Sequence, residues 1–241
     1  MDKEIKWLLN EKYNGVTSEE FERDRERLAA GEPLGYVIGW VPFLHTKIHL
    51  DSRPLIPRSE TEYWVNKVIE DIKKDDPGNL KILDLCAGSG CIGVAVLNSL
   101  PGVIVDFVEM DETHHETIRK NVRENNIEEA RTRIFGGDLF EQLSDTYDVI
   151  LTNPPYIDPK EIAGVESSVL DFEPSGALFG GINGMEIIER IIGDAPQFLK
   201  PGGMLVIEHE PEQGSLIQQL LHGITSYEDQ FGVVRYSVYR N

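Results

Sequence analysis

The tetrapeptide Asn153-Pro154-Pro155-Tyr156 carries the residue types in this chain that are best suited to chemistry. It follows an apolar run, residues 147–152, which predicts a buried strand. Two consecutive prolines cannot continue a strand ladder, so the chain must leave the sheet abruptly and rigidly. The Asn153 side-chain oxygen and the Pro154 carbonyl can accept both hydrogens of a planar NH2 group, and the Tyr156 ring can cover that plane. We therefore predict an amino- or amide-binding site here, with a plain strand-to-loop turn as the alternative.

A glycine-rich turn forms a second candidate site. Residues 81–85 are expected to form a strand and residues 91–97 to open a helix, and the turn between them contains Cys86, Ala87, Gly88 and Gly90. Such a unit opens nucleotide-binding α/β sheets, because glycine lets the backbone approach a ligand closely. By itself the unit is equally consistent with NAD or FAD binding and with simple packing.

Acidic residues lie at the ends of the predicted strands. Asp84 ends the first strand, where it can accept hydrogen bonds from loop amides or approach a cofactor's ammonium group. Glu109 ends the strand of residues 102–108, about 20 residues beyond the loop, where a carboxylate can bind ribose hydroxyls. Asp138 follows the strand of residues 131–135. It is a third candidate binding residue, and the alternative is that its side chain only caps a turn.

These segments together resemble class I S-adenosylmethionine-dependent methyltransferases. The resemblance rests on the Asp84-x-Cys-x-Gly-x-Gly loop, on Glu109 and Asp138, and on the Asn-Pro-Pro-Tyr exit from the sheet. The Asn-Pro-Pro-Tyr motif is shared with amino-methyltransferases of DNA and rRNA, so it does not define the substrate.

Three further stretches resemble the HemK/PrmC family more narrowly. Residues 31–39 (Gly-Glu-Pro-Leu-Gly-Tyr-Val-Ile-Gly) and 55–62 (Leu-Ile-Pro-Arg-Ser-Glu-Thr-Glu) are similar to the segment before that family's catalytic domain. Residues 172–180, with Phe-Glu-Pro and Ala-Leu-Phe-Gly, match a later signature. The members are protein (glutamine-N5) methyltransferases that act on translation release factors. The resemblance covers about residue 28 to the C-terminus.

The resemblance implies methyl transfer from S-adenosylmethionine to the glutamine side-chain nitrogen of the Gly-Gly-Gln motif in a peptide-chain release factor. It assigns catalysis to Asn153, Pro154 and Tyr156. It assigns cofactor binding to Asp84, Cys86, Ala87, Gly88, Gly90, Glu109, Met110, Asp138, Leu139 and Asn153, with Asp138 at the adenine amino group. It assigns substrate binding to Asn153, Pro154, Pro155, Tyr156, Arg58 and Glu173. No metal is expected, since the histidines show no ligand spacing.

The chain departs from the family pattern in two places. Cys86 stands where the family usually has glycine, and only about 30 residues precede the Gly-Glu-Pro signature, whereas the family's helical N-terminal domain is longer. We expect residues 1–30 to dock the body of the release factor. Arg58 is expected at the site mouth, although a surface ion pair with Glu60 is the alternative.

The charge balance weighs against nucleic acid as substrate. The chain has 42 acidic against 23 basic residues, a net charge of −19, whereas proteins that wrap nucleic acid normally carry a basic face. Two rival functions remain. One is an N-methyltransferase of a base in DNA or rRNA, which this charge balance opposes, and the other is a non-catalytic interaction module on the same scaffold.

Cys86 and Cys91 lack metal or redox spacing. No apolar run of about 18 residues predicts a membrane span. We expect a cytoplasmic monomer.

The alternation of apolar runs predicts an α/β fold, and the resemblance specifies a Rossmann-like, seven-stranded, mostly parallel sheet with one antiparallel strand. We expect three parts: a short helical region (1–35), a β-hairpin with a linker helix (36–76), and the methyltransferase domain (77–241). The polar stretch 73–78 marks the last boundary. Expected elements are helices at 3–13, 17–30, 61–74, 112–126, 184–199 and 212–221, a hairpin at 37–50, a strand at 204–208, and a closing strand pair at 226–230 and 234–239.

Overall fold

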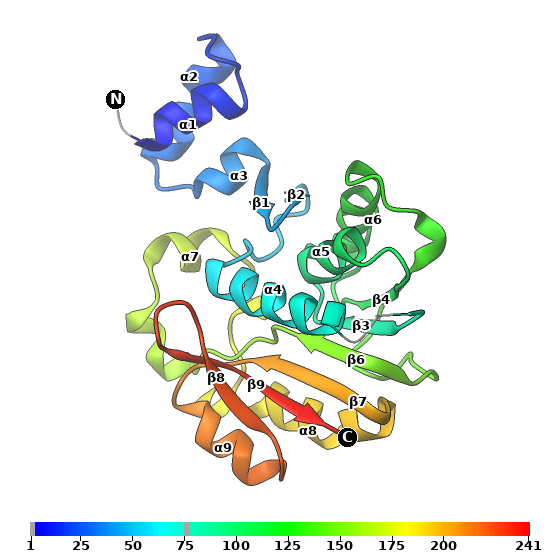
Figure 1. Ribbon diagram of the computed structural model, residues 1–241. Helices are drawn as coiled ribbons and strands as arrows, with labels where there is room; N and C mark the ends of the chain where they lie inside the picture. Colours follow the sequence, from blue (N-terminus) through cyan, green and yellow to red (C-terminus); the bar gives the residue numbers. More distant parts are fainter. Residues whose placement is uncertain (1–2, 75–77) are drawn as a thin grey trace.

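Helices cover both faces of a central sheet in the computed structural model, which describes residues 3–74 and 78–241 (Figure 1). The sheet has seven strands in the order β5-β4-β3-β6-β7-β9-β8. Strands β5, β4, β3, β6 and β7 pair in parallel, and β9 runs antiparallel to both of its neighbours. This topology confirms the predicted fold. The strands are β3 (Lys81–Leu85), β4 (Ile104–Val108), β5 (Thr132–Phe135), β6 (Tyr147–Thr152), β7 (Leu199–Glu208), β8 (Thr225–Glu228) and β9 (Val234–Arg240).

The central strands are buried on both faces. Ile82 and Val149 belong to one apolar cluster, whereas their neighbours Leu83 and Ile150 belong to another. Successive side chains of a strand point to opposite faces of the sheet, so each strand contributes side chains to both apolar clusters. This explains why the central strands have nearly continuous apolar runs, as parallel strands covered on both sides do.

Helices α4, α5 and α6 pack on one face of the sheet, and α8 and α9 pack on the other (Figure 1). The helices are α4 (Ser59–Lys74), α5 (Cys91–Ser99), α6 (His115–Glu124), α7 (Ser167–Phe172), α8 (Glu186–Phe198) and α9 (Gln213–Leu220). The face of α4 that packs on the sheet is apolar and includes the buried residues Trp64, Val65, Val68, Ile69 and Ile72. Within residues 3–74 and 78–241, no helix is long and apolar enough to cross a membrane.

An N-terminal arm, residues 3–38, stands apart from the sheet (Figure 1). It consists of α1 (Lys3–Glu11), α2 (Glu19–Ala29) and α3 (Leu34–Ile38). Leu8, Phe21 and Val37, one from each helix, form its small core. Ser18 caps α2, since its hydroxyl oxygen accepts a hydrogen bond from the Phe21 N–H at 3.2 Å.

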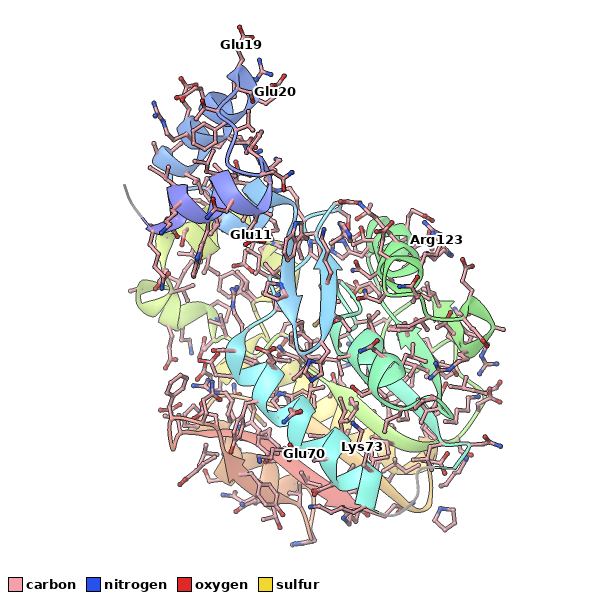
Figure 2. All side chains as sticks on the ribbon, turned by 45° about the horizontal axis from the view of Figure 1, so that its top comes forward. Glu11, Glu19, Glu20, Glu70, Lys73 and Arg123 are labelled. Carbon is pink, nitrogen blue, oxygen red and sulfur yellow. The ribbon has the colours of Figure 1, made fainter. Side chains whose placement is uncertain are left out.

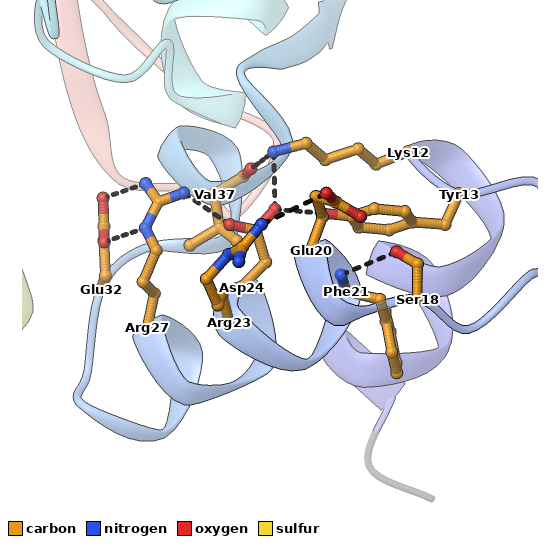
Figure 3. Close-up of polar contacts among 10 residues, drawn as sticks. All are labelled: Lys12, Tyr13, Ser18, Glu20, Phe21, Arg23, Asp24, Arg27, Glu32 and Val37. Atoms are coloured by element: carbon orange, nitrogen blue, oxygen red, sulfur yellow. Dashed lines mark hydrogen bonds and ion pairs between the residues drawn. The ribbon is translucent and has the colours of Figure 1, made fainter.

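A buried carboxylate also holds the arm together (Figure 3). Asp24 accepts hydrogen bonds from Lys12 at 2.6 Å, from the Tyr13 hydroxyl at 2.7 Å and from Arg27 at 2.7 Å. The guanidinium of Arg27 also binds both carboxylate oxygens of Glu32, at 2.8 and 2.7 Å. These hydrogen bonds from Arg27 lower the pKa of Glu32 to about 2, so Glu32 stays ionised.

The start of the predicted hairpin was wrong. Val37 and Ile38 lie in α3, and the hairpin consists of β1 (Trp40–Phe43) and β2 (Thr46–His49). The helix ends at Gly39, whose φ of 94° is left-handed and whose N–H donates to the Gly35 carbonyl. Glycine adopts this conformation without strain, so it separates the helix from the strand.

Other boundaries shifted by a few residues. The predicted helix 112–126 is a 3-10 turn followed by α6, and β7 begins at Leu199, directly after α8. Helix α7 and most of the short 3-10 turns were not predicted. These turns are η1 (Glu112–His114), η2 (Glu129–Arg131), η3 (Pro159–Gly164), η4 (Ser175–Ala177) and η5 (Ile182–Gly184). The boundary expected between residues 76 and 77 lies outside the described residues.

Candidate active site

Strand register brings the predicted site residues to one edge of the sheet. Leu85 of β3 pairs with Val108 of β4 on one side and with Thr152 of β6 on the other. Cys86, Glu109 and Asn153, the next residues of the three strands, therefore leave the sheet side by side. Thr152 in turn pairs with Ile207 of β7, which places Glu208 next to Asn153. Ligands of open α/β sheets bind at this edge.

Glu109 closes the glycine loop. Its Oε2 accepts a hydrogen bond from the Gly88 N–H at 2.7 Å, and its Oε1 accepts one from the Asp111 N–H at 2.8 Å. Cys86 opens the loop with a φ of 61°, in the left-handed region that favours glycine. This conformation gives a physical reason for the glycine that the resembling family usually has there.

Asp84 is completely buried beneath the loop. Its Oδ2 accepts a hydrogen bond from the Gly93 N–H at 2.8 Å, in the first turn of α5 rather than in the loop itself. Its Oδ1 is buried and has no partner among the described residues. Burial raises the pKa of Asp84 to about 8, and the nearby charge of Glu109 acts in the same direction.

The remaining predicted cofactor residues lie beyond β4 and β5. Met110 follows Glu109 and is 65% exposed, which is unusual for a large apolar side chain. Asp138 accepts a hydrogen bond from Arg190 of α8 at 2.7 Å, and the next residue, Leu139, is buried. Asp138 is therefore an ion-pair partner of α8, which the sequence did not indicate.

The Asn-Pro-Pro-Tyr segment is anchored on a buried acid, Glu208. Asn153 Nδ2 donates to the Thr61 hydroxyl oxygen at 3.2 Å, and the Thr61 hydroxyl donates to Glu208 at 2.7 Å. Trp64 Nε1 donates to the same carboxylate at 2.6 Å, and the Tyr156 hydroxyl donates to it at 3.2 Å. Burial raises the pKa of Glu208, and these three donors act against that rise.

The backbone of the segment is held from a second side. Gln213 Nε2 donates to the Tyr156 carbonyl at 2.8 Å and to the Asn183 carbonyl at 3.1 Å. Gly184 allows this close packing, since a Cβ on it would lie 1.8 Å from the Tyr156 carbonyl oxygen. The double proline and these contacts together hold the segment rigidly.

Arg58 and Glu173 form a pair with each other. Arg58 Nη2 lies 2.6 Å from Glu173 Oε1, and Glu173 Oε2 accepts a hydrogen bond from the Ile56 N–H at 3.0 Å. Glu173 is buried, whereas Glu60 accepts a hydrogen bond from Ser59 instead. The alternative pair Arg58–Glu60 was therefore wrong, and residues 55–62 are tied to the Phe-Glu-Pro segment.

Sequence reasoning missed four of the residues that shape this edge: Thr61, Trp64, Glu208 and Gln213. Glu208 carried a signal, because it is an acid that ends an apolar strand, as Asp84 and Glu109 do. Among the described residues, no group of three His, Cys, Asp or Glu side chains could hold a metal ion.

The sheet order, the closed glycine loop and the anchored Asn153 together place the chain in one class of proteins. It has the fold of the class I S-adenosylmethionine-dependent methyltransferases. Solved structures agree: the human Mettl16 catalytic domain superposes with a TM-score of 0.62 at 19% identity, covering 80% of this chain and 75% of that one. The Thermus thermophilus 16S rRNA methyltransferase RsmC, solved with AdoMet and guanosine, gives 0.59 at 16% identity, covering 84% of this chain and 49% of that one.

Sequence comparison identifies the family. Residues 66–170 match the methyltransferase small domain family. A release factor glutamine methyltransferase of Rhodopirellula baltica is 38% identical, covering 77% of this chain and 64% of that one. Relatives with the same name from Bifidobacterium longum and Francisella tularensis are 37% and 36% identical, covering 78% and 80% of this chain and 67% of each relative. The chain belongs to the release factor glutamine methyltransferase family, and its match spans about two thirds of these relatives' length.

Proposed function

We propose that this chain transfers a methyl group from S-adenosylmethionine to the side-chain amide nitrogen of the glutamine in the Gly-Gly-Gln motif of a peptide-chain release factor. One observation carries the proposal. Asn153, bound through its NH2 group to Thr61, lies beside the Pro154 carbonyl at the sheet edge that also holds the glycine loop. Family membership supports the same substrate, because the relatives carry that activity in their names.

The residues of the loop fit the cofactor. The space at Gly88 is open, since a Cβ there would meet no atom within 4 Å. The unpartnered Asp84 Oδ1 lies beneath the same loop and can accept a hydrogen bond. Glu109 offers carboxylate oxygens where ribose hydroxyls bind in nucleotide-binding sheets. We assign the methionine and ribose portions to these residues, and the adenine to Met110, Asp138 and Leu139.

Catalysis then rests on positioning. The cofactor supplies an electrophilic methyl group bound to sulfonium sulfur. An amide nitrogen is a poor nucleophile, because its lone pair is delocalised into the carbonyl. The Asn153 oxygen and the Pro154 carbonyl accept the two hydrogens of the substrate NH2 group and so fix its direction. The Tyr156 ring packs against the amide plane and excludes water. These preorganised dipoles favour the positive charge that develops on the nitrogen.

The N-terminal arm is proposed as a docking surface for the body of the release factor. Glu11, Glu19 and Glu20 project from it into solvent (Figure 2). A release factor acts in translation, so we propose a cytoplasmic enzyme, and one that works as a monomer. The excess of acidic residues, with a net charge of −19, supports a protein substrate over a nucleic acid.

Mass spectrometry of release factors incubated with enzyme and S-adenosylmethionine tests the proposal. We expect one added methyl group on the glutamine of Gly-Gly-Gln. Asn153→Ala should lower the methyl-transfer rate by roughly 10²-fold, the order expected when one preorganised polar contact is deleted. Asn66→Ala, which changes a half-buried asparagine of α4 that donates to Glu70, is the matched control. If no release factor gains a methyl group while an RNA or DNA oligonucleotide does, the proposed substrate is wrong.

A further inference from the structure

Three donors converge on the Glu208 carboxylate at the end of β7. Glu208 is 1% exposed. The Thr61 hydroxyl and Trp64 Nε1 both donate hydrogen bonds to Oε2, at 2.7 and 2.6 Å. The Tyr156 hydroxyl donates one to Oε1 at 3.2 Å. An indole N–H can only donate, so Oε2 is an acceptor. Burial raises the pKa of Glu208, and the three donors oppose that rise because they favour the carboxylate form, which can only accept.

This convergence fixes the direction of the Thr61 hydroxyl. A hydroxyl has one hydrogen, and at 2.7 Å from Oε2 that hydrogen points at the carboxylate. The lone pairs of Thr61 can then only accept a hydrogen bond from any further partner. Asn153 meets this condition, because its NH2 group lies 3.2 Å from the Thr61 oxygen. The reverse orientation would bring two acceptors, the Asn153 carbonyl and the Thr61 oxygen, into contact without a hydrogen.

The direction of Thr61 thereby fixes the orientation of the Asn153 amide. The oxygen and the nitrogen of an amide lie on opposite sides of one planar group, so Oδ1 points away from Thr61. Among the described residues no donor is bound to Oδ1, and Asn153 is half-buried rather than sealed in the core. Oδ1 is therefore available to a ligand at the sheet edge.

We propose that Thr61 and Glu208 are positioning residues that fix the Asn153 amide with its oxygen toward the substrate. This deepens the proposed function and rests on it. A primary amide substrate presents two hydrogens, and it needs two acceptors. Asn153 Oδ1 and the Pro154 carbonyl provide them only in this orientation. In the flipped orientation two NH2 groups would face each other, and the substrate nitrogen would lose its alignment.

The same carboxylate orients Tyr156. Burial and the charge of Glu208 raise the pKa of Tyr156 well above its ordinary value, so the hydroxyl keeps its proton and donates a hydrogen bond to Oε1. A single acid thus aligns an amide through Thr61 and an aromatic ring directly. The two groups that hold the substrate in the proposed reaction share one anchor.

Nuclear magnetic resonance of the side-chain amides tests this directly and does not depend on the substrate. In protein labelled with ¹⁵N-asparagine, the side-chain NH2 group of Asn153 gives a pair of resonances. This pair is identified by its loss in Asn153→Asp. We expect Thr61→Val to shift this pair and to speed its hydrogen exchange, because the acceptor is gone. Thr61→Ser keeps the hydroxyl and should keep the wild-type resonances. Glu208→Gln should also keep the pair bound, since an amide oxygen can still accept from both Trp64 and Thr61.

Turnover on a release factor gives the second readout. We expect Thr61→Val to lower kcat about tenfold, the effect of one misplaced polar contact of about 1.4 kcal/mol, while the affinity for S-adenosylmethionine changes less than twofold. Thr61→Ser should restore most of kcat. Thr117→Val is the matched control, since Thr117 is a buried threonine of α6 whose hydroxyl is hydrogen-bonded to Ser52 and not to Asn153.

The two proposals fail in different ways. If Thr61→Val leaves the Asn153 resonances unchanged, or if Thr61→Ser is as impaired as Thr61→Val, the positioning role is overturned. If the resonances respond as expected but the wild-type protein methylates no release factor, the orientation of Asn153 stands and the proposed substrate falls. Should Thr61→Val fail to fold, Thr61→Ala, which also lacks the hydroxyl, is compared with Thr61→Ser in its place.

Discussion

The Glu109 carboxylate accepts a hydrogen bond from the Gly88 N–H at 2.7 Å, so the acid that ends β4 holds the loop that follows β3. The two residues are 21 positions apart and meet because Leu85 and Val108 are paired at the ends of their strands. Glu109 thus has two tasks in the proposed site. It shapes the glycine loop, and it offers oxygens to the ribose.

Glu109→Ala should weaken the binding of S-adenosylmethionine by at least tenfold. A hydrogen bond to a charged group contributes about 1.5–3 kcal/mol, and the alanine variant loses both the ribose contact and the loop contact. Isothermal titration calorimetry measures the change. Glu129→Ala, at the opposite end of β5, is the control and should bind normally. Wild-type affinity in Glu109→Ala would show that Glu109 does not face the ribose.

Asp84 should make the stability of the protein depend on pH. An unfolded aspartate has a pKa near 4, whereas burial raises the pKa of folded Asp84 to about 8. Between these values only the unfolded chain is ionised at this position. Asp84 therefore makes the free energy of unfolding fall as pH rises, by up to about 1.4 kcal/mol per pH unit, and this fall ends above about pH 8.

Asp84→Asn removes this dependence, because an amide does not ionise and its oxygen can still accept from the Gly93 N–H. We expect the variant to match the wild-type protein near pH 4 and to be more stable at pH 8. Denaturant unfolding at a series of pH values measures the difference. Asp194→Asn, an exposed aspartate of α8, should keep the wild-type profile. A difference between Asp84→Asn and wild type that does not grow with pH would contradict the prediction.

Cys86 should tolerate glycine better than valine. Its left-handed φ of 61° costs an ordinary residue about 1–2 kcal/mol, which glycine does not lose. Glycine, however, loses about 0.5–1 kcal/mol through its greater freedom in the unfolded chain. We expect Cys86→Gly to unfold within about 1 kcal/mol of wild type, and Cys86→Val to lose more, since β-branched side chains fit this region poorly. Cys91→Val, on the ordinary helix α5, is the control, and an equal loss at both positions would exclude backbone strain.

The sequence was sufficient for the features that depend on local patterns. Apolar runs predicted β3 and β6, and the residues that follow them predicted the glycine loop and the Asn-Pro-Pro-Tyr exit. The contacts of Glu208 with Thr61 and of Glu173 with Arg58 could not be predicted in this way. They join residues 147 and 115 positions apart, and they follow from the order of the strands and the course of α7. The start of the hairpin was missed for a smaller reason, because Gly39 ends a five-residue helix that has no strong pattern.

Charge on the N-terminal arm should govern the docking of an intact release factor but not the chemistry. Deleting the arm is a poor test, because Leu8 and Phe21 cover Val37 and a deletion would expose it. Reversing two exposed charges, Glu11→Lys with Glu19→Lys, leaves this core intact (Figure 2). Exposed charge pairs contribute about 0.2–1 kcal/mol each, so the loss of two should raise KM for the whole factor roughly two- to thirtyfold.

Turnover on a short peptide containing Gly-Gly-Gln should not respond to the charge reversal, because the peptide lacks the body of the factor. The KM of the wild-type enzyme for the whole factor should also rise with salt, since the Debye length is only about 10 Å at 0.1 M. Glu70→Lys, on α4 away from the arm, is the control for a general change in net charge (Figure 2). If the arm variant slows peptide and whole factor equally, or if Glu70→Lys has the same effect, the attraction does not come from the arm.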